Sequence, residues 1–252
     1  TSITISDFAY SPTLDRVVAS SMNNFQPIYY SNDHGVNWTG VDAPDNNLRN
    51  MKCVAWGNGR FVAANQHYDS VSIVSTNGTS WTSGGKHNNV APHNLLFNPD
   101  NNTFYATYGT RILSTTSGTS WNEITIGNGT HNVETNGQGP HFAYDNGVYY
   151  VEVQDGSGRM LYSTNLSTWT PLYMHGDSSA RGQGMTMIDG NLYFYVAYGS
   201  GSATGMGLWS NNRHQGFGTP VYNTTFMGVT NKFTFQNSNV YNADTGEIVT
   251  GV

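Results

Sequence analysis

The sequence predicts an all-β protein made from one small structural unit that recurs along the chain. The first observation is a short phrase with a serine, an acidic or amide residue, a glycine and a tryptophan at fixed offsets. Its clearest copy is Ser31-Asn32-Asp33-His34-Gly35-Val36-Asn37-Trp38, and weaker copies follow. The aromatic or final apolar positions of the six copies are 38, 81, 121, 169, 217 and 249. A period near forty residues is typical of repeat architectures.

The second observation is a tight hairpin ahead of each phrase. Asn58-Gly59 and Asn146-Gly147 each separate two short runs of alternating apolar residues. Asn-Gly in this setting is a strong hairpin signal, because both turn residues must tolerate a positive φ. Related turns are expected at 12–15, 98–102, 189–191 and 231–232. Six hairpins therefore accompany six phrases.

The order of these pieces predicts the architecture. Each unit reads as strand, tight turn, strand, loop, strand, phrase, and a fourth strand that bears the tryptophan. Four antiparallel strands in about forty residues describe one blade of a β-propeller. We therefore expect a single domain over residues 1–252, a six-bladed β-propeller of four-stranded antiparallel blades. The expected blades span about 1–43, 44–86, 87–127, 128–175, 176–222 and 223–252.

The repeated phrase has a structural interpretation. Short hydroxyl and carboxylate side chains can accept backbone N–H groups in a turn. The glycine provides a backbone conformation that strains other residues, and the aromatic residue covers apolar surface. The residues assigned to this role are Ser31, Asp33, Gly35, Trp38, Ser75, Trp81, Ser114, Gly118, Trp121, Ser163, Trp169, Ser210, Phe217, Asp244 and Gly246.

The phrase at 31–38 resembles the Asp-box, or BNR repeat, of the sialidase-like superfamily. This resemblance implies a propeller with the boxes on one rim, away from the face where sialidases do their chemistry. It does not extend to the sialidase catalytic set of three arginines, a Tyr-Glu pair and an acid-base aspartate. Of the seven arginines, Arg16, Arg60 and Arg213 are expected on the turn rim, opposite that face.

Composition and charge exclude several function classes. The chain carries a formal net charge of -6 with only ten lysines and arginines, which argues against nucleic-acid binding. No apolar run approaches the length of a membrane-spanning helix. Cys53 stands alone in an apolar run and is interpreted as a buried thiol. The histidines lack the short spacings of metal ligands, so we expect no metal and no cofactor.

Function is expected in the parts that do not repeat. The links between blades and the loops between second and third strands share one face, and they concentrate histidine, aromatic and charged residues. Such residues suit sugar rings or a protein surface. The candidate ligand-binding residues are Arg49, His67, Tyr68, His87, His131, Glu134, Tyr173, His175, Asp177 and Arg181.

The sequence favours a non-catalytic binding module. Its low charge and its richness in Asn, Thr, Ser, Gly and Tyr resemble domains of viral tail fibres and other virion surface proteins. We therefore expect an extracellular or virion-surface protein that recognises a cell-surface receptor, either a glycan or a protein. One alternative is a propeller glycoside hydrolase that uses carboxylates among Glu134, Glu152, Asp155 and Asp177. Another is a structural assembly subunit that contacts neighbouring virion subunits.

Overall fold

The fold consists of short antiparallel sheets that follow one another along the chain. The computed structural model describes residues 4–23, 25–42, 44, 49–65, 71–86, 92, 94–108, 111–125, 141–152, 159–173, 181–188, 191–198, 203–208, 233–236 and 239–242. Every regular element in this described part is a β-strand. Within each sheet, strands that are consecutive in sequence pair with one another, and all of these pairings are antiparallel.

Four of the sheets have four strands each. The first contains β1 (Ile5–Ser11), β2 (Arg16–Ser21), β3 (Ile28–Ser31) and β4 (Thr39–Val41). The second contains β5 (Met51–Gly57), β6 (Arg60–Asn65), β7 (Val71–Ser75) and β8 (Thr82–Lys86). The third contains β9 (Asn94–Asn98), β10 (Thr103–Tyr108), β11 (Arg111–Thr115) and β12 (Asn122–Thr125). The fourth contains β13 (Phe142–Asp145), β14 (Val148–Glu152), β15 (Arg159–Ser163) and β16 (Thr170–Tyr173).

Two further sheets follow in the described part of the chain. One has three strands, β17 (Arg181–Ile188), β18 (Asn191–Tyr198) and β19 (Ala203–Leu208). The other has two strands, β20 (Phe233–Gln236) and β21 (Asn239–Asn242). The prediction of an all-β chain with four-stranded antiparallel sheets is confirmed for the first four repeats.

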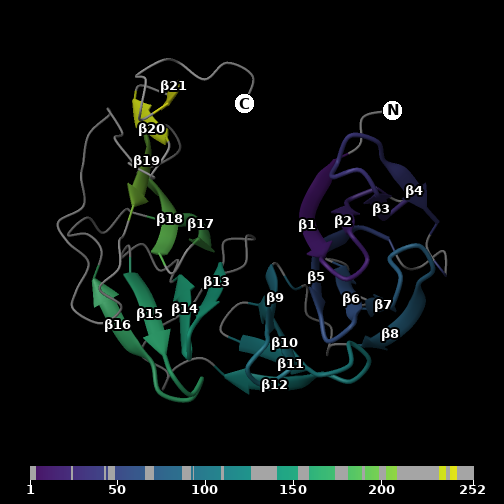
Figure 1. Cartoon of the computed structure of the whole chain (residues 1–252). Helices are drawn as coiled ribbons and strands as arrows, with labels where there is room; N and C mark the ends of the chain where they lie inside the picture. Colours follow the sequence, from purple (N-terminus) through teal and green to yellow (C-terminus); the bar gives the residue numbers. More distant parts are fainter. Residues whose placement is uncertain are drawn as a thin grey trace.

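The sheets are arranged around a common centre in chain order (Figure 1). The first strand of a sheet lies on the inner side and contacts the first strand of the next sheet, as β1 does with β5 and β5 with β9. The same contact recurs between β9 and β13 and between β13 and β17.

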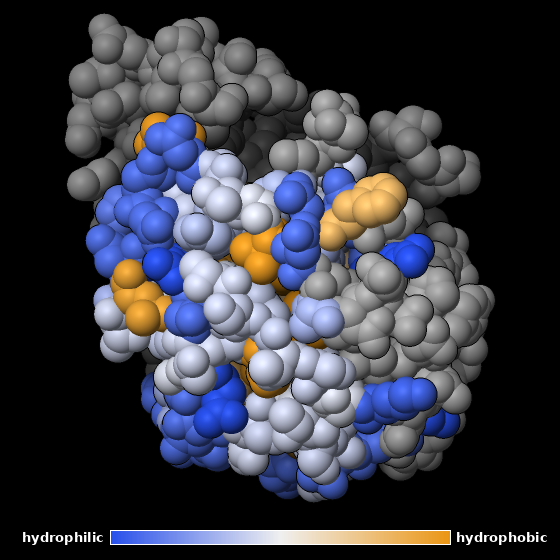
Figure 2. All heavy atoms as spheres, turned by 90° about the vertical axis from the view of Figure 1, so that its right-hand side faces the viewer, coloured by the Kyte–Doolittle hydropathy of each residue, from blue (hydrophilic) through white to orange (hydrophobic). Residues whose placement is uncertain are grey.

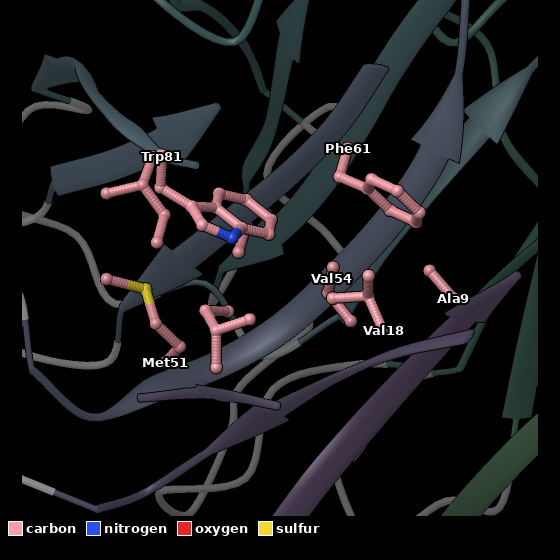
Figure 3. Packing of buried hydrophobic residues seen from close by; sticks show 9 residues of the cluster. Ala9, Val18, Met51, Val54, Phe61 and Trp81 are labelled. Carbon is pink, nitrogen blue, oxygen red and sulfur yellow. The ribbon is translucent and has the colours of Figure 1, made fainter. Parts of the chain in front are cut away.

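The core lies between consecutive sheets. Ala9 and Val18 of the first sheet pack against Val54, Phe61 and Trp81 of the second, as Figure 3 shows. Equivalent clusters join the second sheet to the third and the third to the fourth. Figure 2, by contrast, shows an outer side where hydrophilic residues predominate and apolar ones form small separate patches. No single sheet buries both of its faces alone, so neighbouring sheets stabilise one another.

The tight hairpins form as the sequence predicts. Asn58 and Gly59 have φ values of 46° and 71°, and Asn146 and Gly147 have 46° and 86°. These values are those of a primed turn, whose twist matches the flanking strands. Asp15 and Asn102 also have positive φ values at the ends of the expected turns.

The prediction for the fourth strand needs a correction. The tryptophan was expected within that strand, but β4, β8, β12 and β16 all begin one residue after it. The residues after the tryptophan pair with the third strand, as in the register Tyr30 with Thr39 and Tyr162 with Thr170. The residues that directly follow each tryptophan therefore belong to the sheet and not to the link between sheets.

Candidate functional site

The box turn is held by its own side chains. The Ser31 hydroxyl accepts the N–H groups of Asp33 at 3.3 Å and Gly35 at 2.8 Å, and it donates to Asp33 Oδ1 at 2.7 Å. Asp33 in turn accepts the Asn37 N–H at 2.8 Å. The Asn37 backbone N–H and the Ser31 hydroxyl together lower the pKa of Asp33 to about 2. The Asp33 carboxylate therefore serves to hold the turn together.

The same bonds recur in the following boxes. Ser75 accepts the Gly78 N–H at 2.7 Å, while Asn77 accepts the N–H groups of Thr79 and Ser80. Ser163 and Asn165 repeat this arrangement in the fourth sheet. The indole N–H of Trp81 donates to the carbonyl oxygen of Gly78 at 3.1 Å, which ties the ring to the turn.

The third box begins one residue later than predicted. Ser114 lies inside β11, and the hydroxyl that accepts the N–H groups of Ser117 and Gly118 belongs to Thr115. Ser117 holds the position of Asp33 and accepts the Thr119 N–H at 3.2 Å. A threonine hydroxyl can accept these backbone N–H groups as a serine hydroxyl does. The run of hydroxyl residues around Thr115 therefore left the first residue of the third box ambiguous by one position.

The fourth position of the short boxes requires a left-handed backbone. Gly78 and Gly118 have φ values of 75° and 79° there, whereas the fourth sheet places Leu166 at φ 62°. Leu166 is 7% exposed and belongs to the cluster between the third and fourth sheets. Its burial therefore offsets the backbone strain of about 1–2 kcal/mol.

Two arginines on the rim of the box turns join the first sheet to the second and the second sheet to the third. Arg16, at the start of β2, donates to Asn32 Oδ1 at 2.7 Å and to the carbonyl oxygen of Asn77 in the second box. Arg60, at the start of β6, donates to the carbonyl oxygen of Ser117 in the third box at 3.4 Å. These two arginines therefore have a structural role on the turn rim.

Polar contacts also join the third and fourth sheets on the turn rim. Asn98 donates to the hydroxyl of Tyr149 at 2.6 Å, and the hydroxyl of Tyr144 bonds to Asp100. Burial raises the pKa of both tyrosines above their ordinary value, which favours the protonated phenol in these contacts. Many polar side chains of this rim thus form hydrogen bonds with residues of their own or the neighbouring sheet.

A serine between the second and third sheets forms a further link. The indole N–H of Trp121 donates to Ser72 Oγ at 3.1 Å. The Ser72 hydroxyl lies 2.5 Å from the carbonyl oxygen of Gly118 and 3.0 Å from that of Gly85. Sequence analysis missed Ser72, because its hydrogen-bond partners are up to 49 residues away in the chain.

Three of the ten predicted ligand-binding residues lie in the described part of the chain, at the rim opposite the box turns. Arg49 is exposed just before β5, while Tyr173 ends β16 and Arg181 begins β17. The last two were expected in a link but occupy strand ends, in register with Arg159 and Ala197. The candidates that lie outside the described residues are His67, Tyr68, His87, His131, Glu134, His175 and Asp177.

Of the four carboxylates of the hydrolase alternative, one lies in the described part of the chain. Glu152 ends β14 of the fourth sheet, whereas Glu134, Asp155 and Asp177 fall outside the described residues. Of the remaining box residues, Ser210, Phe217, Asp244 and Gly246 also lie outside them.

Asp7 is a half-buried carboxylate that the sequence analysis missed. It lies in β1, where its Oδ2 accepts the N–H of Val54 from β5 at 3.0 Å and its Oδ1 accepts the Phe8 N–H at 2.8 Å. Burial raises the pKa of Asp7 to about 6, while the two N–H groups and Lys52 oppose the shift. Asp7 therefore links the inner strands of the first two sheets.

The raised pKa of Asp7 makes stability depend on pH. In the folded state Asp7 keeps its proton up to about pH 6, whereas the unfolded chain releases it near pH 3.8. The free energy of unfolding should therefore fall by roughly 2–3 kcal/mol as the pH rises from about 4 to about 7. Asp7→Asn cannot ionise but still offers an acceptor to Val54. We expect it to be more stable than the wild type at about pH 7 and to match it at about pH 4.

Urea denaturation at several pH values measures this difference. Asp42→Asn serves as the control, because Asp42 is an exposed aspartate that directly follows β4 of the first sheet. Equal pH profiles for the wild type and Asp7→Asn would contradict the assignment.

Three other features were sought among the described residues: a reactive thiol, a metal-binding cluster and a membrane-spanning helix. Cys53 is 1% exposed, and burial raises the pKa of its thiol well above the usual value, so it is not a reactive nucleophile. Among the residues that the structure describes, no group of three His, Cys, Asp or Glu side chains could hold a metal ion. The same residues contain no helix with the length and hydropathy needed to cross a membrane.

Comparisons with known proteins identify the fold. No protein-family model matches the sequence, and no curated protein does so either. The structure is similar to the WD40 β-propeller domain of Doa1, with 10% identity over 94% of this chain and 77% of that chain and a TM-score of 0.58. It is also similar to YCF48 from Cyanidioschyzon merolae, with 14% identity over 82% and 72% of the two chains and a TM-score of 0.56.

A third similar structure is the GH74 enzyme of Niastella koreensis. It is 22% identical over 81% of this chain, with a TM-score of 0.54, and the match covers 29% of the enzyme's own length. These neighbours have varied functions, so together they establish a β-propeller fold and no specific activity.

Proposed function

We propose that this chain is a non-catalytic binding module, a six-bladed β-propeller of the Asp-box type that recognises a cell-surface glycan through the loops between its blades. The observation that carries this proposal is a difference between the two rims of the ring in which residues recur. Residues that recur from sheet to sheet, such as Ser31, Arg16 and Arg60, bond within the ring on the turn rim. Of the candidate residues that do not recur, Arg49, Tyr173 and Arg181 lie next to strand ends at the opposite rim, and we assign the binding of a partner to that rim.

The strand register supports a sixth blade. In the second sheet the box serine Ser75 pairs with Phe61, and in the fourth sheet Ser163 pairs with Tyr149. In the last sheet Asn242 pairs with Phe233, so Asn242 holds the same place at the end of a third strand. β20 and β21 thus correspond to the second and third strands of a blade, followed by the predicted box.

The chemistry of the loop rim suits a polar ligand with an apolar face. Tyr173 and Arg181 are close in sequence, and they occupy the end of β16 and the start of β17. A phenol ring can stack on a sugar, and a guanidinium binds hydroxyl or carboxylate groups in a bidentate manner. A net charge of -6 disfavours an anionic polymer and leaves neutral or weakly charged glycans as the favoured class. The same chemistry is consistent with an extracellular or virion-surface setting.

Glycan-array binding with matched variants tests the proposal. We expect Tyr173→Ala and Arg181→Ala each to weaken binding by about tenfold or more, which corresponds to about 1.4 kcal/mol. Thr76→Ala is the control, because Thr76 is exposed on a box turn of the opposite rim and should leave binding unchanged. A wild-type protein that binds no glycan and no cell surface would overturn the proposal, and release of reducing sugar from a bound glycan would support the hydrolase alternative.

A further inference from the structure

Three asparagine–glycine pairs lie in tight turns of the described part of the chain. Asn58-Gly59 joins β5 to β6, Asn146-Gly147 joins β13 to β14, and Asn77-Gly78 belongs to the second box. An asparagine before glycine can lose its side-chain amide, because glycine has no side chain that shields its backbone nitrogen. This nitrogen is the atom that attacks the asparagine side chain. The contacts of the glycine N–H therefore decide which of the pairs reacts.

The two hairpin turns match in conformation and in the space around them. Asn58 and Asn146 both have a φ of 46°, and both are exposed, as are the glycines that follow them. A Cβ placed on Gly59 or on Gly147 would meet no atom within 4 Å. Neither turn is therefore crowded by a neighbouring sheet, and backbone conformation does not distinguish the two asparagines.

The two turns differ in what the glycine N–H contacts. At Gly147 it donates to the hydroxyl oxygen of Tyr144 at 2.9 Å. Trp56 occupies the place of Tyr144 in the second sheet, since each lies two residues before the asparagine of its turn. An indole ring has no acceptor for an N–H group. Among the residues that the structure describes, no protein group accepts the N–H of Gly59.

The pair in the second box is held at both of the groups that would react. The Gly78 N–H donates to Ser75 Oγ at 2.7 Å. Asn77 Oδ1 accepts the N–H groups of Thr79 at 2.9 Å and Ser80 at 2.8 Å. The first bond keeps the proton on the glycine nitrogen, and the other two fix the orientation of the side-chain amide. The box therefore protects Asn77.

We propose that Asn58 is a site of spontaneous deamidation in the folded protein and that Tyr144 protects Asn146 from the same reaction. The Gly59 nitrogen loses its proton and bonds to Asn58 Cγ, and the bond from Cγ to the side-chain nitrogen breaks, so that ammonia leaves. Water from the solvent then opens the cyclic imide at either carbonyl carbon, which gives aspartate or isoaspartate. This modification needs no enzyme and does not rest on the proposed binding function.

Isoaspartate at this turn is expected to weaken the junction between the second and third sheets. It adds a carbon atom to the main chain of a two-residue turn, whose length and twist set the register of β5 with β6. Arg60 follows the turn directly and donates to the carbonyl oxygen of Ser117 in the third box at 3.4 Å. A shift of Arg60 would lengthen this bond, so the modification acts on a contact between sheets.

Peptide mapping of folded protein stored at neutral pH tests the assignment. Trypsin cuts after Lys52 and Arg60, so residues 53–60 form a peptide in which Asn58 is the only asparagine. We expect isoaspartate to accumulate there several-fold faster than at Asn146, which fragmentation of its own peptide locates. In urea-unfolded protein the two rates should become similar, because both asparagines precede glycine. Equal rates in the folded protein, or no isoaspartate at Asn58, would overturn the proposal.

Two variants test the protective hydroxyl. Tyr144→Phe keeps the ring but removes the oxygen that accepts the Gly147 N–H. Asn146 should then deamidate about as fast as Asn58. Asp100→Asn is the matched control, because it leaves the Tyr144 hydroxyl in place and still offers an oxygen to its proton, so Asn146 should stay protected. If Tyr144→Phe does not raise the rate at Asn146, the hydroxyl has no protective role.

The effect on stability has a control of its own. Asn58→Gly cannot deamidate at this position, and a Gly-Gly pair suits the same type of turn. After storage, the urea midpoint of the wild type should fall in step with the isoaspartate content of residues 53–60, whereas Asn58→Gly should lose clearly less. Equal losses in the two proteins would contradict the expected effect on the junction.

Discussion

Replacing Gly85 with alanine is expected to disrupt the junction between the second and third sheets. A Cβ at this position would lie 1.8 Å from the carbonyl oxygen of Thr119, and 2.5 Å from the carbonyl carbon of the same residue. The obstacle is backbone, so no side-chain rotation can relieve it. We expect a loss of about 3 kcal/mol or more in the free energy of unfolding, at the upper end of overpacking effects.

The polar link at this junction would be lost as well. Ser72 reaches the carbonyl oxygens of both Gly85 and Gly118, which requires the two backbones to stay close. Gly59→Ala is the matched control, because a Cβ there meets no atom within 4 Å. It should cost only the strain of a positive φ, about 1–2 kcal/mol. Chemical denaturation compares the two, and equal losses would show that close packing at Gly85 is not what matters.

Truncating Phe61 is expected to produce the largest loss from a single buried side chain. Phe61 is 0% exposed, and its ring lies 4.5 Å from that of Trp56 and 6.2 Å from that of Trp81. It also packs on the first sheet, within the cluster of Figure 3. Phe61→Ala should therefore cost about 3–5 kcal/mol, from lost burial and the cavity left behind.

Phe61→Leu provides the comparison for this prediction. Leucine keeps most of the apolar volume, so we expect a smaller loss of about 1–2 kcal/mol. Thermal and urea denaturation measure both variants. If the alanine variant were as stable as the leucine variant, the junction between the first two sheets would not depend on this ring.

The repeat predicted the fold because its signals are local. Asn58-Gly59 and Asn146-Gly147 form the predicted turns, since asparagine and glycine tolerate a positive φ wherever they occur. The box turns are equally local, and their bonds join residues two to four positions apart, as in Ser31 to Gly35. The strand order within each of the first four sheets could therefore be predicted from sequence.

The errors arose where partners are distant or interchangeable. Thr115 and Ser114 offer the same hydroxyl, so the sequence could not place the third box to the residue. Asp7 reads as an ordinary polar strand residue, because its partner Val54 is 47 positions away. The predicted ligand-binding residues differ from repeat to repeat. A comparison of the repeats therefore could not show which of them form a site. Arg49, Tyr173 and Arg181 are the ones whose backbone position the structure gives.

The arginine contacts have a consequence for how the chain is made on the ribosome. Arg16 donates to the carbonyl oxygen of Asn77, which is synthesised 61 residues later, and Arg60 waits 57 residues for Ser117. A nascent blade therefore remains incomplete until its successor has emerged from the exit tunnel. We therefore expect a stalled or truncated chain to present an arginine whose acceptor in the next sheet has not yet been made.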